Sequence, residues 1–172
     1  MARPFSKSGQ VIRVRLEPHV RQLIASMVDQ LRELLLVDNG SELTRLYPTA
    51  YPDDVERQAD YHAVVHDQLL MARLEAIDVV ESTIDAEELT VDQADAWLTT
   101  VNQIRLVLGT KLDVTEDDHT IDPDDPDASA QVIYQVLSHV LDSLTTARAS
   151  LLLSLIHISE PTRPMKESRM PT

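Results

Sequence analysis

Four segments of the chain repeat apolar residues at the three- and four-residue spacing of an amphipathic helix. The first covers residues 18–37, starting at Pro18, which a first helical turn tolerates, and stopping at the turn-forming Asp38-Asn39-Gly40. Its apolar positions are Val20, Leu23, Ile24, Met27, Val28, Leu31, Leu34 and Leu35. The pattern predicts a long helix that packs one face on a core.

The second segment covers residues 55–82, and Asp53 or Asp54 can cap its first turn. Two apolar stripes run along it side by side and together cover more than half of the circumference. We therefore expect this helix to be central and to touch several neighbours. One stripe contains Val55, Ala59, Ala63, Leu70, Leu74 and Ile77, and the other Val65, Leu69, Ala72, Ala76 and Val79.

The third helix is predicted to begin near Val91, because Thr90 and Gln93 have the spacing of a capping box. Gly109 is a natural residue to follow its last turn. An acidic loop, residues 113–127, separates this helix from a fourth that starts at about Ala128. The inward positions expected on the two helices are Ala94, Trp97, Leu98, Val101, Ile104 and Leu108, then Ile133, Val136, Leu137, Val140, Leu141, Leu144 and Leu151.

Residues 11–16 differ from the rest, because they alternate and are rich in β-branched side chains. They predict a short strand, which a turn at Ser8-Gly9 would join to a partner strand. The fold class expected is mainly α, a compact bundle of about four helices with a short N-terminal β-strand or hairpin. Residues 1–16 would form a basic arm that includes the strand, and residues 17–153 the helical domain.

Residues 154–172 are treated as a non-native tail. The string SLIHISEPTRP at residues 154–164 resembles one that recurs at the ends of unrelated conceptual translations, where it is explained by read-through into a sequencing adaptor. The helical period fails after Leu153, and Pro161 and Pro164 cannot continue a helix.

The composition is that of one domain with an aliphatic core. The 172 residues include one Trp, one Phe and no cysteine, so disulfides, thiolate metal sites and thiol switches are excluded. The chain has no apolar run long enough to cross a bilayer, and its start lacks the apolar region of a signal peptide. A cytoplasmic location is expected.

The formal net charge is −14, which disfavours a broad nucleic-acid-binding face. The first 15 residues nevertheless carry four bases, including Arg13 and Arg15, and no acid. Residues 113–127 carry eight acids, among them Glu116, Asp117 and Asp118. Charge runs of this kind usually solvate a terminus or a loop.

His62 and His66 lie one helical turn apart, which is a metal-ligand spacing with Asp67 nearby. The Glu of an H-E-x-x-H motif and an obvious third ligand are both lacking, so a hydrogen-bonded core or interface histidine is the plainer interpretation of His66. We expect no metal site. The acidic loop likewise lacks the mid-loop Gly and the terminal Glu of a calcium-binding EF-hand.

Arg105 falls on the apolar face of the third helix, where an unpaired charge is costly. We expect it to pair with a carboxylate of the second helix, for which Asp67, Glu75 and Asp78 are candidates. Trp97 shares that face and is expected in the core. No phosphate-binding loop, nucleophile elbow or cysteine nucleophile is present, so we expect neither an enzyme nor a bound cofactor.

One segment, residues 93–118, QADAWLTTVNQIRLVLGTKLDVTEDD, is distinctive enough to suggest a family. It resembles the AosR-like oxidative-stress regulators of actinobacteria, formerly described as a domain of unknown function. The residues VIRVRLEPHV at 11–20 and LYPTAYPDD at 46–54 are similar in the same order. The resemblance implies a cytoplasmic, non-enzymatic regulator linked to transcription under oxidative stress, which contacts an RNA polymerase sigma factor.

The expected partner is therefore a protein, with no membrane and no stable nucleic-acid binding by this chain alone. Candidate interaction residues are Arg13, Arg15, Asn102, Arg105, Glu116, Asp117 and Asp118. Because cysteine is absent, redox input would have to come through a partner or through methionine, such as Met27 or Met71. The alternatives are a structural adaptor or homo-oligomer joined along the second helix, and a metal-binding protein centred on His62 and His66.

Overall fold

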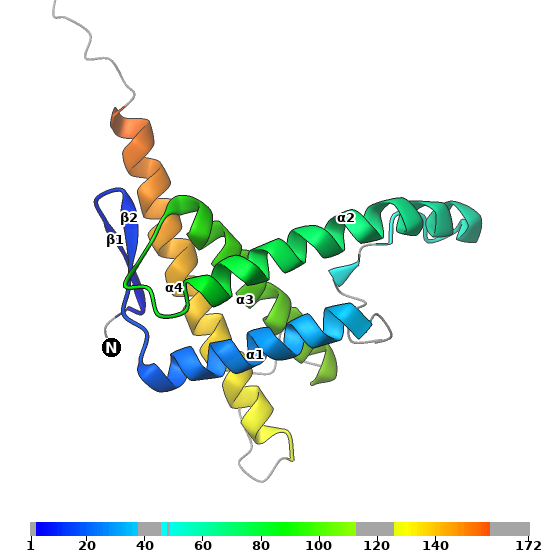
Figure 1. Ribbon diagram of the computed structural model, residues 1–172, viewed down its shortest axis with the longest axis horizontal. Helices are drawn as coiled ribbons and strands as arrows, with labels where there is room; N and C mark the ends of the chain where they lie inside the picture. The colour runs from blue at the N-terminus through cyan, green and yellow to red at the C-terminus, as the bar shows by residue number, and fades with distance from the viewer. Residues whose placement is uncertain (1–2, 38–45, 48, 113–125, 159–172) are drawn as a thin grey trace, which may run out of the picture.

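Four helices and a small sheet make up the computed structural model, which describes residues 3–37, 46–47, 49–112 and 126–158 (Figure 1). The helices are α1 (Pro18–Val37), α2 (Val55–Ser82), α3 (Val91–Lys111) and α4 (Ala128–Ile158). The strands are β1 (Phe5–Ser8), β2 (Val11–Val14) and β3 (Glu88–Leu89). The predicted mainly-α bundle with an N-terminal hairpin is confirmed.

The hairpin forms for the local reason that the sequence indicated. β1 and β2 pair in antiparallel register, with Phe5 opposite Val14 and Ser8 opposite Val11. Gly9 lies in the turn at φ +62°, a left-handed conformation that costs glycine little. β3 was not predicted; its two residues pair with β2, so that the sheet order is β1-β2-β3.

The helix starts follow from their caps. Asp54 accepts a hydrogen bond from the backbone N–H of Arg57, 3.0 Å away, and begins α2. Thr90 and Gln93 form the predicted capping box of α3. The turn at residues 38–40, which was predicted to end α1, lies outside the described residues.

Two predicted helix ends are wrong. α3 continues past Gly109, which is buried, and ends at Lys111, where the N–H of Leu112 bonds to the Leu108 carbonyl with ordinary right-handed geometry. A left-handed residue is therefore not needed to end this helix. α4 continues past Leu153 to Ile158, because a proline at residue 161 limits only the turn before it. Leu153 and Ile156 are more than half exposed, so this last stretch is helical with little packing.

The central helix is α3, and the prediction that α2 is central is wrong. α3 packs most extensively against α2 and α4, and residues around most of its circumference are buried. In α2 only His66, Ile77 and Val80 are buried, and its N-terminal half projects from the body (Figure 1). Four of the eleven stripe positions are alanine, and alanine gains little from burial because its apolar side chain is small.

Trp97 is fully buried at the centre, as expected. Its ring meets that of Phe5 edge-on, with centroids 6.0 Å apart, so the hairpin closes one end of the helical core. Ser143 of α4 accepts a hydrogen bond from the Phe5 N–H at 3.0 Å, which attaches β1 to α4. The hairpin of β1 and β2 is therefore part of the core rather than a free extension.

Candidate functional site

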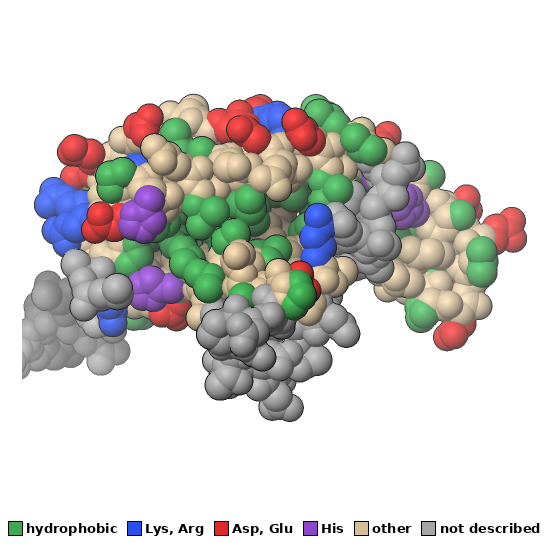
Figure 2. All heavy atoms as spheres, turned by 90° about the horizontal axis from the view of Figure 1, so that it is seen from below, with side chains coloured by type: hydrophobic (Ala, Val, Ile, Leu, Met, Phe, Trp, Pro, Cys, Tyr) green, Lys and Arg blue, Asp and Glu red, His purple; other side chains and the backbone are tan. Residues whose placement is uncertain are grey.

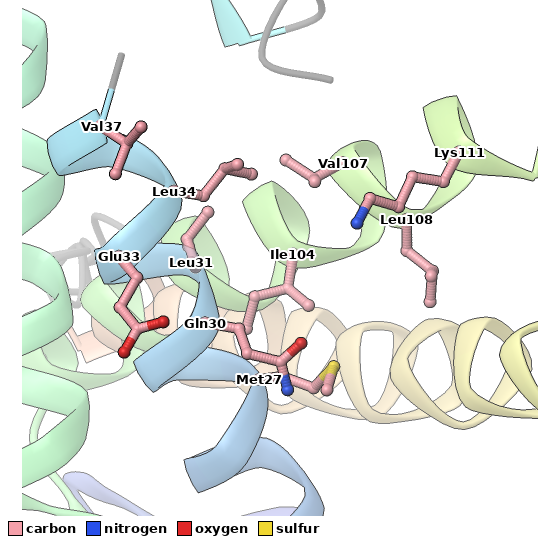
Figure 3. A pocket seen from close by; sticks show the side chains of 10 residues that line it. All are labelled: Met27, Gln30, Leu31, Glu33, Leu34, Val37, Ile104, Val107, Leu108 and Lys111. Carbon is pink, nitrogen blue, oxygen red and sulfur yellow. The ribbon is translucent and has the colours of Figure 1, made fainter. Parts of the chain in front are cut away.

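An open apolar groove with a volume of about 370 Å³ lies between α1 and α3 (Figure 3). Buried Leu31, Ile104 and Val107 form its floor. Seen from below in Figure 2, hydrophobic side chains gather in a hollow on this side of the molecule. The remaining lining residues are Met27, Gln30, Glu33, Leu34, Val37, Leu108 and Lys111.

Helical spacing places these side chains on facing walls. Met27, Leu31 and Leu34 recur at four and three residues along α1, and on α3 Val107 and Leu108 lie three and four residues after Ile104. Each set faces the other helix, but the helices leave space between them instead of closing it. The apolar stripe of α1 also runs over its end, where Leu36 is 62% and Val37 64% exposed.

The sequence interpretation missed this groove, because it assigned every inward apolar position of α1 and α3 to a closed core. The signal was present in the run Leu34-Leu35-Leu36-Val37, which is apolar all round the last turn of α1. When the last turn of a helix is apolar on every side, its apolar surface is larger than one neighbouring helix can bury.

The outer edge of α1 next to the groove is acidic. Arg32 points to α2, where its guanidinium donates to Asp78 at 2.6 Å and to both carboxylate oxygens of Glu81 at 3.0 and 2.9 Å. Hydrogen bonds to Glu81 and then Asp78 raise the pKa of Arg32. This cation therefore ties α1 to α2 and does not neutralise the groove edge, where Glu33 is exposed.

Arg105 has no ion pair with any described residue, so the predicted pairing with α2 is wrong. Its guanidinium donates to Asn102 at 3.3 Å and lies over the ring of Tyr134 of α4, 5.9 Å from the centroid. Asp78, one of the three expected partners, binds Arg32 instead. Arg105 is half-buried against α4, which shields its charge with an aromatic face rather than a carboxylate.

The other predicted interaction residues lie on separate elements or outside the described residues. Arg13 is exposed and pairs with Glu88 across the sheet at 3.1 Å, and Arg15 is exposed beyond the end of β2. Within the described parts of the chain, no hydrogen bond or ion pair connects these arginines with Asn102 or Arg105. Glu116, Asp117 and Asp118 lie outside the described residues.

His62 and His66 belong to an aromatic cluster with Tyr47. Tyr47 stacks on His66 with ring centroids 4.7 Å apart, and His62 lies 4.7 Å from His66. Arg73 covers the other side of Tyr47 at 4.7 Å and donates to the Leu46 carbonyl, while burial lowers the pKa of its guanidinium. This cluster holds residues 46–47 on α2, a role for Tyr47 and Arg73 that the sequence did not indicate.

Residues 3–37, 46–47, 49–112 and 126–158 contain no group of three His, Asp or Glu side chains suited to holding a metal ion. The hypothesis of a metal site at His62 and His66 therefore lacks a third ligand in that part of the chain. Within the same residues, no helix is both long and apolar enough to cross a membrane.

Comparison with known proteins identifies a family. The sequence pattern of the domain of unknown function DUF2017 matches residues 2–148, which include all of the sheet, α1, α2 and α3, and most of α4. The chain belongs to the DUF2017 family. The match to DUF2017 thus includes both walls of the groove. No curated protein and no solved structure matches the chain.

Proposed function

We propose that this DUF2017 domain is a non-enzymatic regulator that acts by binding another protein. The groove between α1 and α3 carries the proposal, because it offers a preformed apolar surface bordered by charged groups. A protein side chain that enters such a hollow gains apolar burial, and the charged edge selects among partners.

The finer proposal is that the domain acts in the cytoplasm, in transcription under oxidative stress, with a sigma factor as partner. It is supported by the resemblance of residues 93–118 to AosR-like regulators and by the net charge of −14. An acidic protein can dock on the basic DNA-binding surface of a sigma factor and compete with phosphate.

Methionine offers a route for redox input in a chain without cysteine. Met27 lies in the wall of the groove, and Met71 is 58% exposed on α2. Oxidation of a methionine to the sulfoxide makes an apolar side chain polar, so a sulfoxide at Met27 would weaken apolar docking. Binding by the Met27→Leu variant should then lose its sensitivity to peroxide, whereas the Met71→Leu variant should keep it.

The test is direct binding of the purified chain to each sigma factor of its native host and to the core polymerase, before and after peroxide treatment. We expect one sigma factor to bind saturably. Lack of binding to every sigma factor and to the polymerase, under both conditions, would refute the regulatory proposal.

A second candidate function, a homo-oligomeric adaptor, is supported by the projecting half of α2. Val55 is 86% and Val64 66% exposed there, and Met71 continues the exposed apolar positions. Light scattering should show a dimer that Val64→Glu disrupts. The control Val132→Glu, at an exposed position of α4, should leave the dimer intact. A monomer at all accessible concentrations would dispose of this candidate.

A further inference from the structure

We infer that the groove between α1 and α3 binds an amphipathic helix of the partner, with basic side chains along the edge that faces α1. The inference rests on the proposed function, since it specifies which part of a protein partner the groove receives. It follows from the shape of the groove, its two helical walls and the charge along its edges.

The length of the groove suits a short helical segment. The α1 wall extends from Met27 to Val37 and the α3 wall from Ile104 to Lys111. At about 1.5 Å per residue these walls measure about 15 and 10 Å, which is two to three helical turns. The volume of about 370 Å³ holds inserted side chains but not a whole helix. A partner helix would therefore lie along the opening and insert apolar residues from one face.

A helix fits these walls better than an extended strand. Adding a strand requires an open sheet edge, and both walls here are helices whose backbone groups are hydrogen-bonded internally. The side chains of Met27, Leu31 and Leu34 form a ridge at helical spacing along α1, and such a ridge packs against apolar residues at i, i+3 or i+4, and i+7 of a third helix.

The edge of the groove on α1 carries negative charge without a cation beside it. Glu33, which lines the groove, is exposed and forms no ion pair within the described residues. Asp29, one turn earlier, lies beside α2 instead. The two arginines of α1 are engaged elsewhere, Arg32 with Asp78 and Glu81, and Arg21 with the carbonyls of Ile84 and Ala86. Lysine or arginine on the partner helix would therefore meet the uncompensated carboxylate of Glu33 on α1.

The opposite wall of the groove carries a lysine. Lys111 lies in the last turn of α3, and Figure 3 places it across the groove from Glu33. The overall charge of −14 adds attraction for basic partners at a distance.

The test uses synthetic helical peptides that share one apolar face and differ only in the edge residues. One carries lysines along one edge, one carries glutamates there, and binding to the full chain is measured by fluorescence anisotropy. We expect saturable binding of the lysine-edged peptide. Glu33→Lys should weaken it by about fivefold to tenfold, and the glutamate-edged peptide should bind the Glu33→Lys variant better than the original chain.

The matched control is Glu75→Lys, which makes the same charge change on an exposed site of α2 away from the groove. Equal weakening by Glu33→Lys and Glu75→Lys would overturn the inference, because it would indicate only general charge attraction. Val37→Asp, at an exposed position that should not impair folding, tests the apolar part and should also weaken binding. Hydrogen exchange on the complex should show protection along residues 27–37 and 104–111; protection confined to α2 would contradict the inference.

The outcomes separate this inference from the proposed function. If a sigma factor binds and Glu33→Lys and Val37→Asp leave its affinity unchanged, the groove is not the docking site, although the domain is still a protein-binding regulator. If no sigma factor or polymerase binds, the regulatory proposal fails, whatever the peptides do.

Discussion

At the scale of single residues, Trp97 shows how one side chain joins three elements. Its indole N–H donates to the Thr83 hydroxyl at 2.8 Å, and that hydroxyl donates to the Val79 carbonyl at 2.6 Å at the end of α2. The ring also contacts Phe5 of β1. All of this lies in the core, so the lone tryptophan acts in stability rather than as an exposed binding residue.

The Thr83→Val variant should unfold with a free energy lower by about 1–3 kcal/mol, because the buried indole N–H loses its acceptor while the shape is kept. Urea denaturation followed by Trp97 fluorescence measures the change. Thr99→Val is the control, since the exposed Thr99 hydroxyl bonds only to the backbone of its own helix. A similar loss in both variants would mean that the Trp97–Thr83 bond has no special weight.

At the scale of elements, the sheet depends on α4 for its position. Ser143 is buried, accepts from the Phe5 N–H at 3.0 Å and donates back to the Phe5 carbonyl at 3.3 Å. These bonds join residues 138 positions apart in the chain. A single hydroxyl therefore satisfies both the N–H and the carbonyl of Phe5.

Ser143→Ala should lower the free energy of unfolding by about 1–3 kcal/mol, because it leaves the Phe5 N–H unsatisfied in the core. Hydrogen exchange of the hairpin amides should accelerate more than that of α3. The control is Ser138→Ala on the same helix, whose hydroxyl bonds only to the Tyr134 carbonyl one turn back. Unchanged exchange in the hairpin of the Ser143 variant would show that other contacts hold β1 in place.

At the scale of the whole molecule, the core extends beyond the end of the family match at residue 148. Leu151 is fully buried among the core residues, whereas Leu152 and Leu153 are substantially exposed. Near the end of the match, Arg148 joins α4 to α3 by donating to both carboxylate oxygens of Asp95 at 2.7 and 3.0 Å. These hydrogen bonds raise the pKa of Arg148. The stable unit therefore includes α4 at least as far as Leu151.

A chain shortened to end at residue 148 should be less stable than one that ends at residue 153 by at least about 2 kcal/mol, the low end for removing a buried leucine side chain. The 153-residue chain should match the full-length protein. Thermal denaturation of the three chains measures this order. Equal stability of the chains ending at 148 and 153 would remove Leu151 from the core.

The sequence predicted those parts of the fold that depend on neighbours a few residues away. Pro18–Val37 has the predicted bounds, and so does Val55–Ser82, because periodicity, Asp54 and the alanine- and leucine-rich stretches act within one or two turns. The start of α3 at Val91 follows from the Thr90–Gln93 box in the same way. The family resemblance was carried by such segments too, and the DUF2017 match covers them.

The candidate site could not be predicted in this way, because an apolar residue that lines an open groove has the same local pattern as one in a closed core. Leu34 and Leu108 were expected to face inward, and only the spacing between α1 and α3 leaves them on the wall of a hollow. The neighbours of Arg105 are another case, since Arg32 engages the Asp78 that Arg105 was expected to bind.

The sequence by itself thus determined where the helices and the hairpin begin and which faces of the helices are apolar. It also determined that the protein is acidic and lacks cysteine. The tertiary structure alone decided that α3 and not α2 is central and that a groove remains between α1 and α3. It also decided that Glu88 and Leu89, in the connection between α2 and α3, add a third strand to the hairpin. The reason is physical. Caps and periodicity are satisfied within one element, whereas burial and charge pairing depend on which elements come to lie together.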